Sequence, residues 1–143
     1  MIPSFSHRIE VRFRDCDLMG HVNNAVYFTY FEQARLVAAD TLGLRRALEK
    51  TGLGLILVHG SCDYKAQVKL GDIVEVRMTV VAVGGTSFTL HYEVHRVRDD
   101  AVVALGKSVQ VVFNYEIGKS APIPDSLREK LDALVTGSSI ALE

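Results

Sequence analysis

The feature that most limits the folds open to this chain is a long apolar helix, predicted between Asn24 and Leu42. Apolar side chains recur there at steps of three and four residues, the spacing of one helical face. They are Tyr27, Tyr30, Phe31, Ala34, Val37, Ala38 and Leu42. The helix would be about 28 Å long. Its polar residues are few, namely Glu32, Gln33, Arg35 and Asp40, so we expect it to be covered on several sides, with its Tyr/Phe cluster in the core.

Alternating strands flank this helix in the sequence. Residues 5–14 place Phe5, Ile9 and Phe13 on one face and charged residues on the other, which predicts a half-buried strand. Four more strands are predicted after the helix, at Leu55–Tyr64, Ile73–Val83, Thr86–Arg98 and Ala101–Tyr115. Tight turns separate the last three from what precedes them, at Gly71-Asp72, the two-residue hairpin signal Gly84-Gly85 and Asp99-Asp100. This order predicts an α+β fold in which a five-stranded antiparallel sheet wraps around the central helix.

Shorter elements complete the chain. Gly43 is expected to end the central helix, and Leu44–Lys50 to add a short amphipathic one. The strand 101–115 is nearly all apolar, which favours a place at the centre of the sheet or cover on both faces. Ser126 is predicted to cap a short helix that runs to Leu134, and the Gly-Ser-rich end to be loose. We expect residues 1–143 to form one domain with its core at about 5–116 and this tail at 122–143.

Composition excludes several functional classes. With 143 residues and a net charge of −1, the chain has no general field that would attract nucleic acid, and no basic run carries interleaved aromatic residues. Two cysteines, Cys16 and Cys62, do not make a disulfide framework and fit a reducing compartment. The N-terminus lacks the pattern of a signal peptide, and no apolar run is long enough to span a membrane. A cytoplasmic protein without membrane or nucleic-acid partners is expected.

Familiar ligand-binding motifs fail on inspection. Gly118-Lys119-Ser120 resembles the end of a phosphate-binding loop, but Phe113 stands where its first glycine belongs. Cys16, His21, His59 and Cys62 invite a metal site; however, His59 and Cys62 are three apart on a predicted strand, so their side chains point to opposite faces. We expect neither a metal site nor a cofactor. His91 and His95 share one side of a predicted strand and are expected to be solvated.

The best candidate for chemistry is the turn from Asp15 to Asn24, which joins the first strand to the central helix. Asp17 stands a few residues before the helix N-terminus, Gly20 gives the turn freedom, and Asn23 or Asn24 is suited to cap the first turn. Backbone N–H groups and the positive end of the helix dipole would then face the carboxylate. A carboxylate beside backbone donors suits acyl transfer, since one acts on a carbonyl carbon while the other polarises its oxygen. On local chemistry alone, both aspartates can equally be ordinary turn residues.

A family resemblance adds to this interpretation. Asp15-x-Asp17-x-x-Gly20-His21-Val22-Asn23-Asn24-x-x-Tyr27, followed by Phe31-Glu32-x-Ala34-Arg35, resembles the hotdog-fold acyl-CoA thioesterases of the 4-hydroxybenzoyl-CoA thioesterase family. The similarity covers roughly residues 6–115 and includes the order of the later strands. It implies a hotdog fold and hydrolysis of an acyl-CoA or acyl-carrier-protein thioester, without metal or redox cofactor, by a homodimer or homotetramer.

The resemblance also assigns roles to residues. Asp17 matches the catalytic carboxylate, as nucleophile or as general base, and Asn24 matches a backbone N–H that polarises the thioester carbonyl. His21 and Asn23 either shape the turn or contact the substrate. Val58, His59 and Gly60 match a strand that faces the site across a dimer interface. Asp15 has no matching catalytic role and is interpreted as structural.

Some residues differ from the family pattern, and others allow more than one interpretation. Gly84-Gly85-Thr86 lies where some relatives hold the coenzyme A phosphates with basic residues, so Lys65, Lys69 or Arg96 are candidates instead. Glu32 is either a second catalytic carboxylate or the ion-pair partner of Arg35 at helical spacing. Two other functions remain open, a non-catalytic acyl-thioester binding protein and a hotdog hydratase or dehydratase. The sequence does not identify the acyl group.

Overall fold

The computed structural model of the protein describes residues 3–135. The chain begins with strand β1 (Phe5–Glu10), a single 3₁₀ turn (Phe13–Asp15), the central helix α1 (Val26–Thr41) and the short helix α2 (Leu44–Glu49). Strands β2 (Gly54–Tyr64), β3 (Ile73–Val83), β4 (Ser87–Arg96) and β5 (Ala101–Asn114) follow, then the two-residue β6 (Lys119–Ser120) and helix α3 (Asp125–Val135). The α+β arrangement predicted from the sequence is confirmed.

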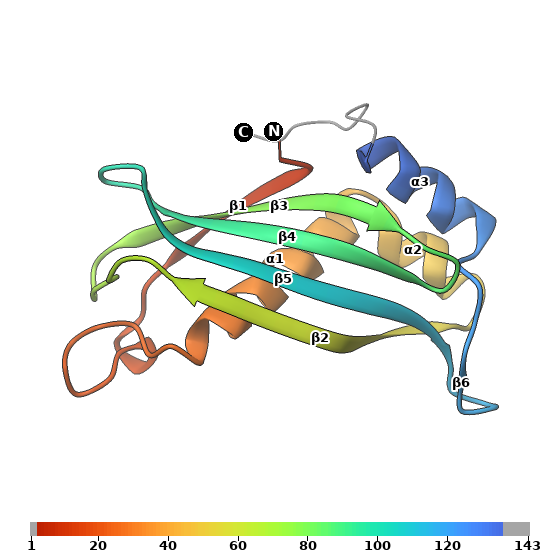
Figure 1. Cartoon of the computed structure of the whole chain (residues 1–143), viewed down its shortest axis with the longest axis horizontal. Coiled ribbons are helices and arrows are strands. Elements are labelled where there is room, and N and C mark those ends of the chain that lie inside the picture. Colours follow the sequence, from red (N-terminus) through yellow and green to blue (C-terminus); the bar gives the residue numbers. More distant parts are fainter. Residues whose placement is uncertain (1–2, 136–143) are drawn as a thin grey trace.

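The five long strands form one antiparallel sheet in the order β1-β3-β4-β5-β2, with β6 paired to the end of β5. Helix α1 lies along one face of this sheet (Figure 1). The nearly all-apolar β5 is an interior strand next to β2 rather than the central one. Its residues Val102 and Leu105 are exposed, so the predicted cover on both faces is absent for these side chains. Strand β2 ends the sheet, and its outer edge is unpaired within the described chain.

The core lies between α1 and the inner face of the sheet. The predicted aromatic cluster of α1 is buried there, with Tyr27, Tyr30 and Phe31 each at most 3% exposed. The ring of Phe31 stacks on Tyr92 of β4 at 4.4 Å between centroids. Gly106 of β5 makes room for this ring, because a Cβ at that position would overlap it. A side chain larger than hydrogen is therefore excluded at this point of the sheet.

Helix α1 is covered by the sheet on its buried face but leaves one strip open to solvent. Phe28 and Leu36 are 39% and 61% exposed. Together with exposed Glu32 they recur at four-residue steps, so they form one stripe of the helix. A single copy of the sheet therefore leaves a partly apolar strip of α1 open.

The first strand is shorter than predicted. It ends at Glu10, and a 3₁₀ turn at Phe13–Asp15 replaces its last residues. Phe13, expected on the buried face, is 83% exposed for this reason. The alternation of apolar and charged residues continues through this turn, so periodicity alone does not reveal where the strand stops.

Several other boundaries also differ from expectation. Helix α3 already begins at Asp125, so Ser126 lies inside its first turn and does not cap it. Neither Gly84 nor Gly85 has a positive φ, and the loop between β3 and β4 spans three residues. Gly43 does end α1, with φ of 75°. The Gly-Ser-rich end lies outside the described residues.

Candidate active site

The turn between Asp15 and Asn24 is folded by its own backbone. The Asp17 N–H donates to the His21 carbonyl at 2.8 Å, and the Gly20 N–H donates to the Asp17 carbonyl at 3.0 Å. Gly20 has φ of 81°, a conformation that residues with side chains seldom adopt. The Val22 N–H donates to the Val68 carbonyl at 2.8 Å, which ties the turn to the segment before β3. Asp17 is thus presented on a compact loop anchored at both ends.

The Asp17 carboxylate is exposed and hydrogen-bonded within this loop. Its Oδ1 accepts from the Met19 N–H at 2.9 Å and from the His21 N–H at 3.4 Å. Two backbone donors on one oxygen fix the direction of the carboxyl group. Its Oδ2 has no hydrogen-bond partner among residues 3–135. This geometry is compatible with two roles for Asp17, a structural one in the turn and a catalytic one as a fixed carboxylate.

The start of α1 offers a free backbone donor next to this turn. Asn23 Oδ1 accepts from the Ala25 N–H at 2.9 Å, so Asn23, one of the two predicted caps, stabilises the turn that leads into the helix. The N–H of Asn24 has no acceptor in the described part of the chain. Its carbonyl accepts from the Tyr64 hydroxyl at 2.8 Å, which fixes the end of β2 to the start of α1. Asp17, His21, Asn23 and Asn24 thus lie in one short, hydrogen-bonded segment that leads into α1.

Asp15 is the buried anchor of the turn, with 2% exposure. Its Oδ2 accepts from the Arg12 N–H and the Tyr30 hydroxyl, both at 2.9 Å, and its Oδ1 from Arg12 Nη2 at 3.1 Å. Burial raises the pKa of Asp15, but the hydrogen bonds from Arg12 and Tyr30 outweigh it, so the pKa lies below its usual value. Burial and Asp15 both raise the pKa of Tyr30. The structural interpretation of Asp15 fits these contacts.

Replacing Asp15 with asparagine should destabilise the protein by about 1–3 kcal/mol at neutral pH, because the amide lacks the charge that Arg12 stabilises. A carboxyl group whose pKa is lowered by folding stabilises the native state above its unfolded pKa, here 3.8, and loses this contribution as the pH falls. The difference between wild type and variant should therefore shrink in acid. Urea unfolding at neutral and acidic pH measures it; a difference independent of pH would contradict this account.

The predicted strand residues Val58, His59 and Gly60 lie on β2 and are exposed. The pairing of β2 with β5 shifts register between Leu57 and His59, so Val58 is an extra, bulged residue. Gly60 lies against Phe28 of α1, since a Cβ there would meet the ring of Phe28 at 3.6 Å. No hydrogen bond joins these three residues to Asp17 within the described subunit. The expectation that these three residues face the site across a dimer interface stays a prediction.

A cavity of about 410 Å³ lies farther along α1, where α1, α2 and the inner face of the sheet diverge. Glu32 and Arg35 both line it. The predicted ion pair between them is absent from the described residues; Arg35 Nη1 instead donates to the Tyr92 hydroxyl at 3.2 Å. The Arg35 guanidinium is thus bonded to the Tyr92 hydroxyl of the sheet instead of to Glu32. Glu32 is exposed at the cavity.

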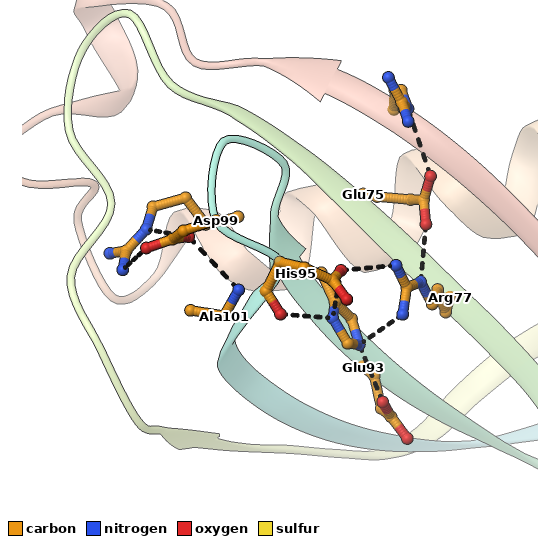
Figure 2. Close-up of polar contacts among 9 residues, drawn as sticks. Glu75, Arg77, Glu93, His95, Asp99 and Ala101 are labelled. Atoms are coloured by element: carbon orange, nitrogen blue, oxygen red, sulfur yellow. Dashed lines mark hydrogen bonds and ion pairs between the residues drawn. The ribbon is translucent and has the colours of Figure 1, made fainter.

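A second polar cluster lies on the other face of the sheet, where Figure 2 shows His95 between Arg77 and Glu93. His95 is 6% exposed, so the expectation that it is solvated was wrong. Its Nε2 lies 2.9 Å from Glu93 and 3.1 Å from Arg77, and its Nδ1 lies 3.1 Å from Asp100. Arg77 also pairs with Glu75 at 2.6 Å and Asp100 at 2.8 Å. Arg77 pairs with two carboxylates, and both ring nitrogens of His95 have polar partners, which is typical of a structural network.

The candidate contacts for coenzyme A differ from one another. Arg96 is already engaged, because it pairs with Asp99 at 2.7 Å and donates to the Gln67 carbonyl at 2.6 Å. Lys65 and Lys69 are exposed and form no ion pair within residues 3–135. The backbone of Lys69 forms an isolated antiparallel β-bridge with His21, which is part of the Asp17 turn. Lys69 is therefore the better placed cation.

Among the described residues, no three or more His, Cys, Asp or Glu side chains are grouped so that they could hold a metal ion. In the same part of the chain, every helix is too short or too polar to cross a membrane.

Comparison with known sequences gives a consistent result. Residues 11–131 match the family described as the thioesterase-like superfamily. The acyl-CoA thioesterase YbgC of Haemophilus influenzae is 30% identical over 121 residues, which cover 83% of this chain and 86% of that protein. A putative esterase of Aquifex aeolicus is also 30% identical, over 89% of this chain and 97% of its own.

Solved structures agree. A thioesterase of Thermus thermophilus, crystallised with coenzyme A and zinc, is 32% identical and superposes with a TM-score of 0.80 over 94% of this chain and 97% of its own. A predicted thioesterase of Bacillus stearothermophilus is 31% identical, with a TM-score of 0.81 over 92% of this chain and 96% of its own. The hotdog fold expected from the sequence is confirmed.

Proposed function

The chain belongs to the thioesterase-like superfamily, and from this premise we propose that it hydrolyses acyl-CoA thioesters with Asp17 as its catalytic carboxylate. Its enzyme class is that of its relatives, thioester hydrolases. The observation that carries the finer proposal is the Asp17 carboxylate, held by two backbone N–H groups in the turn that leads to the free Asn24 N–H at the start of α1.

The chemistry requires one group to attack the thioester carbon and another to hold its oxygen. The Asn24 N–H donates to the carbonyl oxygen as it gains negative charge. Asp17 either attacks the carbon itself, giving a mixed anhydride that water then cleaves, or removes a proton from an attacking water. In both cases the carbon–sulfur bond breaks, the thiol of coenzyme A leaves with a proton, and the free acid remains. His21 and Asn23 shape the turn.

We propose further that two copies of the chain associate through their β2 strands. β2 is an edge strand, and it exposes apolar side chains, among which Leu57 and Val58 are 50% and 55% exposed. The open stripe of α1 with Phe28 and Leu36 adds to this surface. An edge strand can pair with its own copy in antiparallel fashion about a two-fold axis, which satisfies its free backbone groups and buries both apolar surfaces.

This pairing would complete the site across the interface. The Asp17 turn lies at the Tyr64 end of β2, because Tyr64 is bonded to Asn24. The cavity lies at the other end of β2, where Leu55 and Leu57 line it. When two β2 strands run antiparallel, the turn of one subunit faces the cavity of its partner. Val58, His59 and Gly60 then lie at the centre of the interface, where the resemblance places them.

The proposal also covers the cellular location of the protein and the thiol that leaves in the reaction. Two free thiols, Cys16 and Cys62, fit a reducing, cytoplasmic location. Lys69, exposed beside His21, is positioned to meet a phosphate of coenzyme A. A carrier-protein thioester presents the same acyl group on the same phosphopantetheine arm, attached to a protein instead of a nucleotide, and competition between the two thioesters in one assay separates them.

Thiol release from a panel of short, long and aromatic acyl-CoAs tests the proposed activity. We expect turnover of at least one of them and a mass of about two chains in solution. Tight binding of an acyl-CoA, seen as a higher melting temperature without thiol release, would instead indicate a binding protein. Formation of an enoyl-CoA without free thiol would indicate a hydratase or dehydratase.

A further inference from the structure

The cavity beside α1 has the size and lining of a ligand pocket. Its volume of about 410 Å³ falls in the range of small-molecule sites. Most of its wall is apolar, with contributions from α1, α2, α3 and the strands β2, β3 and β4. These side chains include Leu36, Leu44, Leu57, Phe88, Leu90 and Leu127. A wall of this kind suits the hydrocarbon part of an acyl group.

One polar side chain in this wall lacks a partner. Gln110 of β5 lines the cavity and is 6% exposed. Its Nε2 has no hydrogen-bond partner in the described part of the chain. Buried amides are almost always paired, and an unpaired one costs stability. The buried amide of Gln110 is explained if a bound molecule supplies an acceptor for its Nε2–H group.

A second donor group lines the same cavity. The Arg35 guanidinium carries five N–H donors, and its hydrogen bond to the Tyr92 hydroxyl uses one of them. That hydroxyl in turn lies 2.6 Å from Ser108 Oγ. Ser108 and Gln110 are alternate residues of β5, so both side chains point to the same face of the sheet. The polar part of the cavity wall itself consists of the Gln110 amide, the guanidinium groups of Arg35 and Arg45, and the exposed carboxylate Glu32.

We propose that this cavity selects acyl groups that carry an oxygen acceptor remote from the thioester, and that Gln110 Nε2 donates the hydrogen bond that recognises it. The acceptor is a hydroxyl or a carboxylate oxygen, since both accept from an amide N–H and from Arg35. An acyl chain with a plain hydrocarbon end leaves Gln110 unpaired and is bound less tightly. This inference rests on the proposed function, because it assigns the acyl part of the substrate to the cavity.

Matched acyl-CoAs test the selection. For chain lengths from hexanoyl to decanoyl, each plain acyl-CoA is compared with its ω-hydroxy and ω-carboxy analogues by kcat/KM. We expect one oxygenated series to exceed the plain one by about tenfold at its best length, the effect of one good hydrogen bond. Whichever series gains more identifies the acceptor as hydroxyl or carboxylate. Equal values for all three series at every length would overturn the proposal.

Gln110→Leu removes the donor and keeps an apolar wall. It should lower kcat/KM for the oxygenated substrate about tenfold and leave the plain substrate unchanged or improved. Gln67→Leu, the same change at an exposed position, is the matched control. Gln110→Glu should suppress an ω-carboxy substrate more than an ω-hydroxy one, because two carboxylates repel. An equal loss on plain and oxygenated substrates would overturn the assignment to Gln110.

Two measurements without turnover keep this test independent of the proposed activity. Free ω-hydroxy or ω-carboxy acids should raise the melting temperature of wild type more than the plain acid does, and Gln110→Leu should abolish the difference. Gln110→Leu itself should melt no lower than wild type, since it removes an unpaired buried amide. Thiol release without any preference in either assay refutes the inference alone; selective binding without thiol release refutes the proposed catalysis alone.

Discussion

Replacing Asp17 with asparagine is expected to lower kcat by a factor on the order of a thousand while the fold stays intact. The amide oxygen can still accept from the Met19 and His21 N–H groups, as Asp17 Oδ1 does at 2.9 and 3.4 Å, so the turn is preserved. The amide is neither a nucleophile nor a base at neutral pH, so both versions of the mechanism fail. Thiol release measures kcat, and the melting temperature shows that the variant is folded.

Two further variants make this experiment specific. Asp132→Asn, the same change on an exposed residue of α3, should leave kcat unaltered. Asp17→Glu keeps the carboxylate on a longer arm and should recover part of the rate. Wild-type kcat in Asp17→Asn would rule out Asp17 as the catalytic group and return it to the role of an ordinary turn aspartate.

Local sequence patterns were sufficient to predict most of the fold. The helix around Tyr30 and Phe31 and the strand Ile73–Val83 follow from periodicities of 3.6 and two residues, which depend on neighbours along the chain. The Asp17 turn was predictable for the same reason, because a strand pattern stops and a helix pattern begins there. The roles of its residues came from the family resemblance and are still predictions.

Features that depend on contacts between residues far apart in the chain were not predicted from the sequence. The 3₁₀ turn that ends β1 depends on Asp15 bonding to Tyr30, fifteen residues later. His95 is buried because Arg77 of the neighbouring strand and Asp100 of the next turn close over it. The Glu32–Arg35 pair suggested by helical spacing gave way to Tyr92 of β4. A helix or strand pattern carries no information on which side chain another element will present.

The cavity and its unpaired Gln110 are also features that depend on residues far apart in the sequence. In the sequence, Gln110 interrupts an apolar strand and gives no sign of its surroundings. Its significance arises only because α1 and α2 diverge from the sheet above it and leave about 410 Å³ open. The proposed specificity for an acyl group therefore depends on the space between elements, whereas the proposed catalytic turn is one continuous segment.

A mixture of two inactive variants should regain activity if Asp17 of one subunit serves the cavity of its partner. Asp17→Asn removes the catalytic group, and Ala39→Phe fills the cavity that Ala39 lines. In a dimer that contains one copy of each, one site has both defects and the other has neither. Half of the dimers in an equal mixture are of this kind, so about a quarter of the wild-type rate should return.

The recovery should appear after the two variants are unfolded and refolded together, or expressed together, and not when folded dimers are briefly combined. Mixing Asp17→Asn with the double variant Asp17→Asn/Ala39→Phe is the control, because every site then lacks Asp17. If each subunit used its own Asp17 with its own cavity, every site in the mixed dimer would keep one defect and no activity would return. That result would contradict the two-fold pairing of β2, since this pairing is what places the Tyr64 end of one strand beside Leu55 and Leu57 of the other.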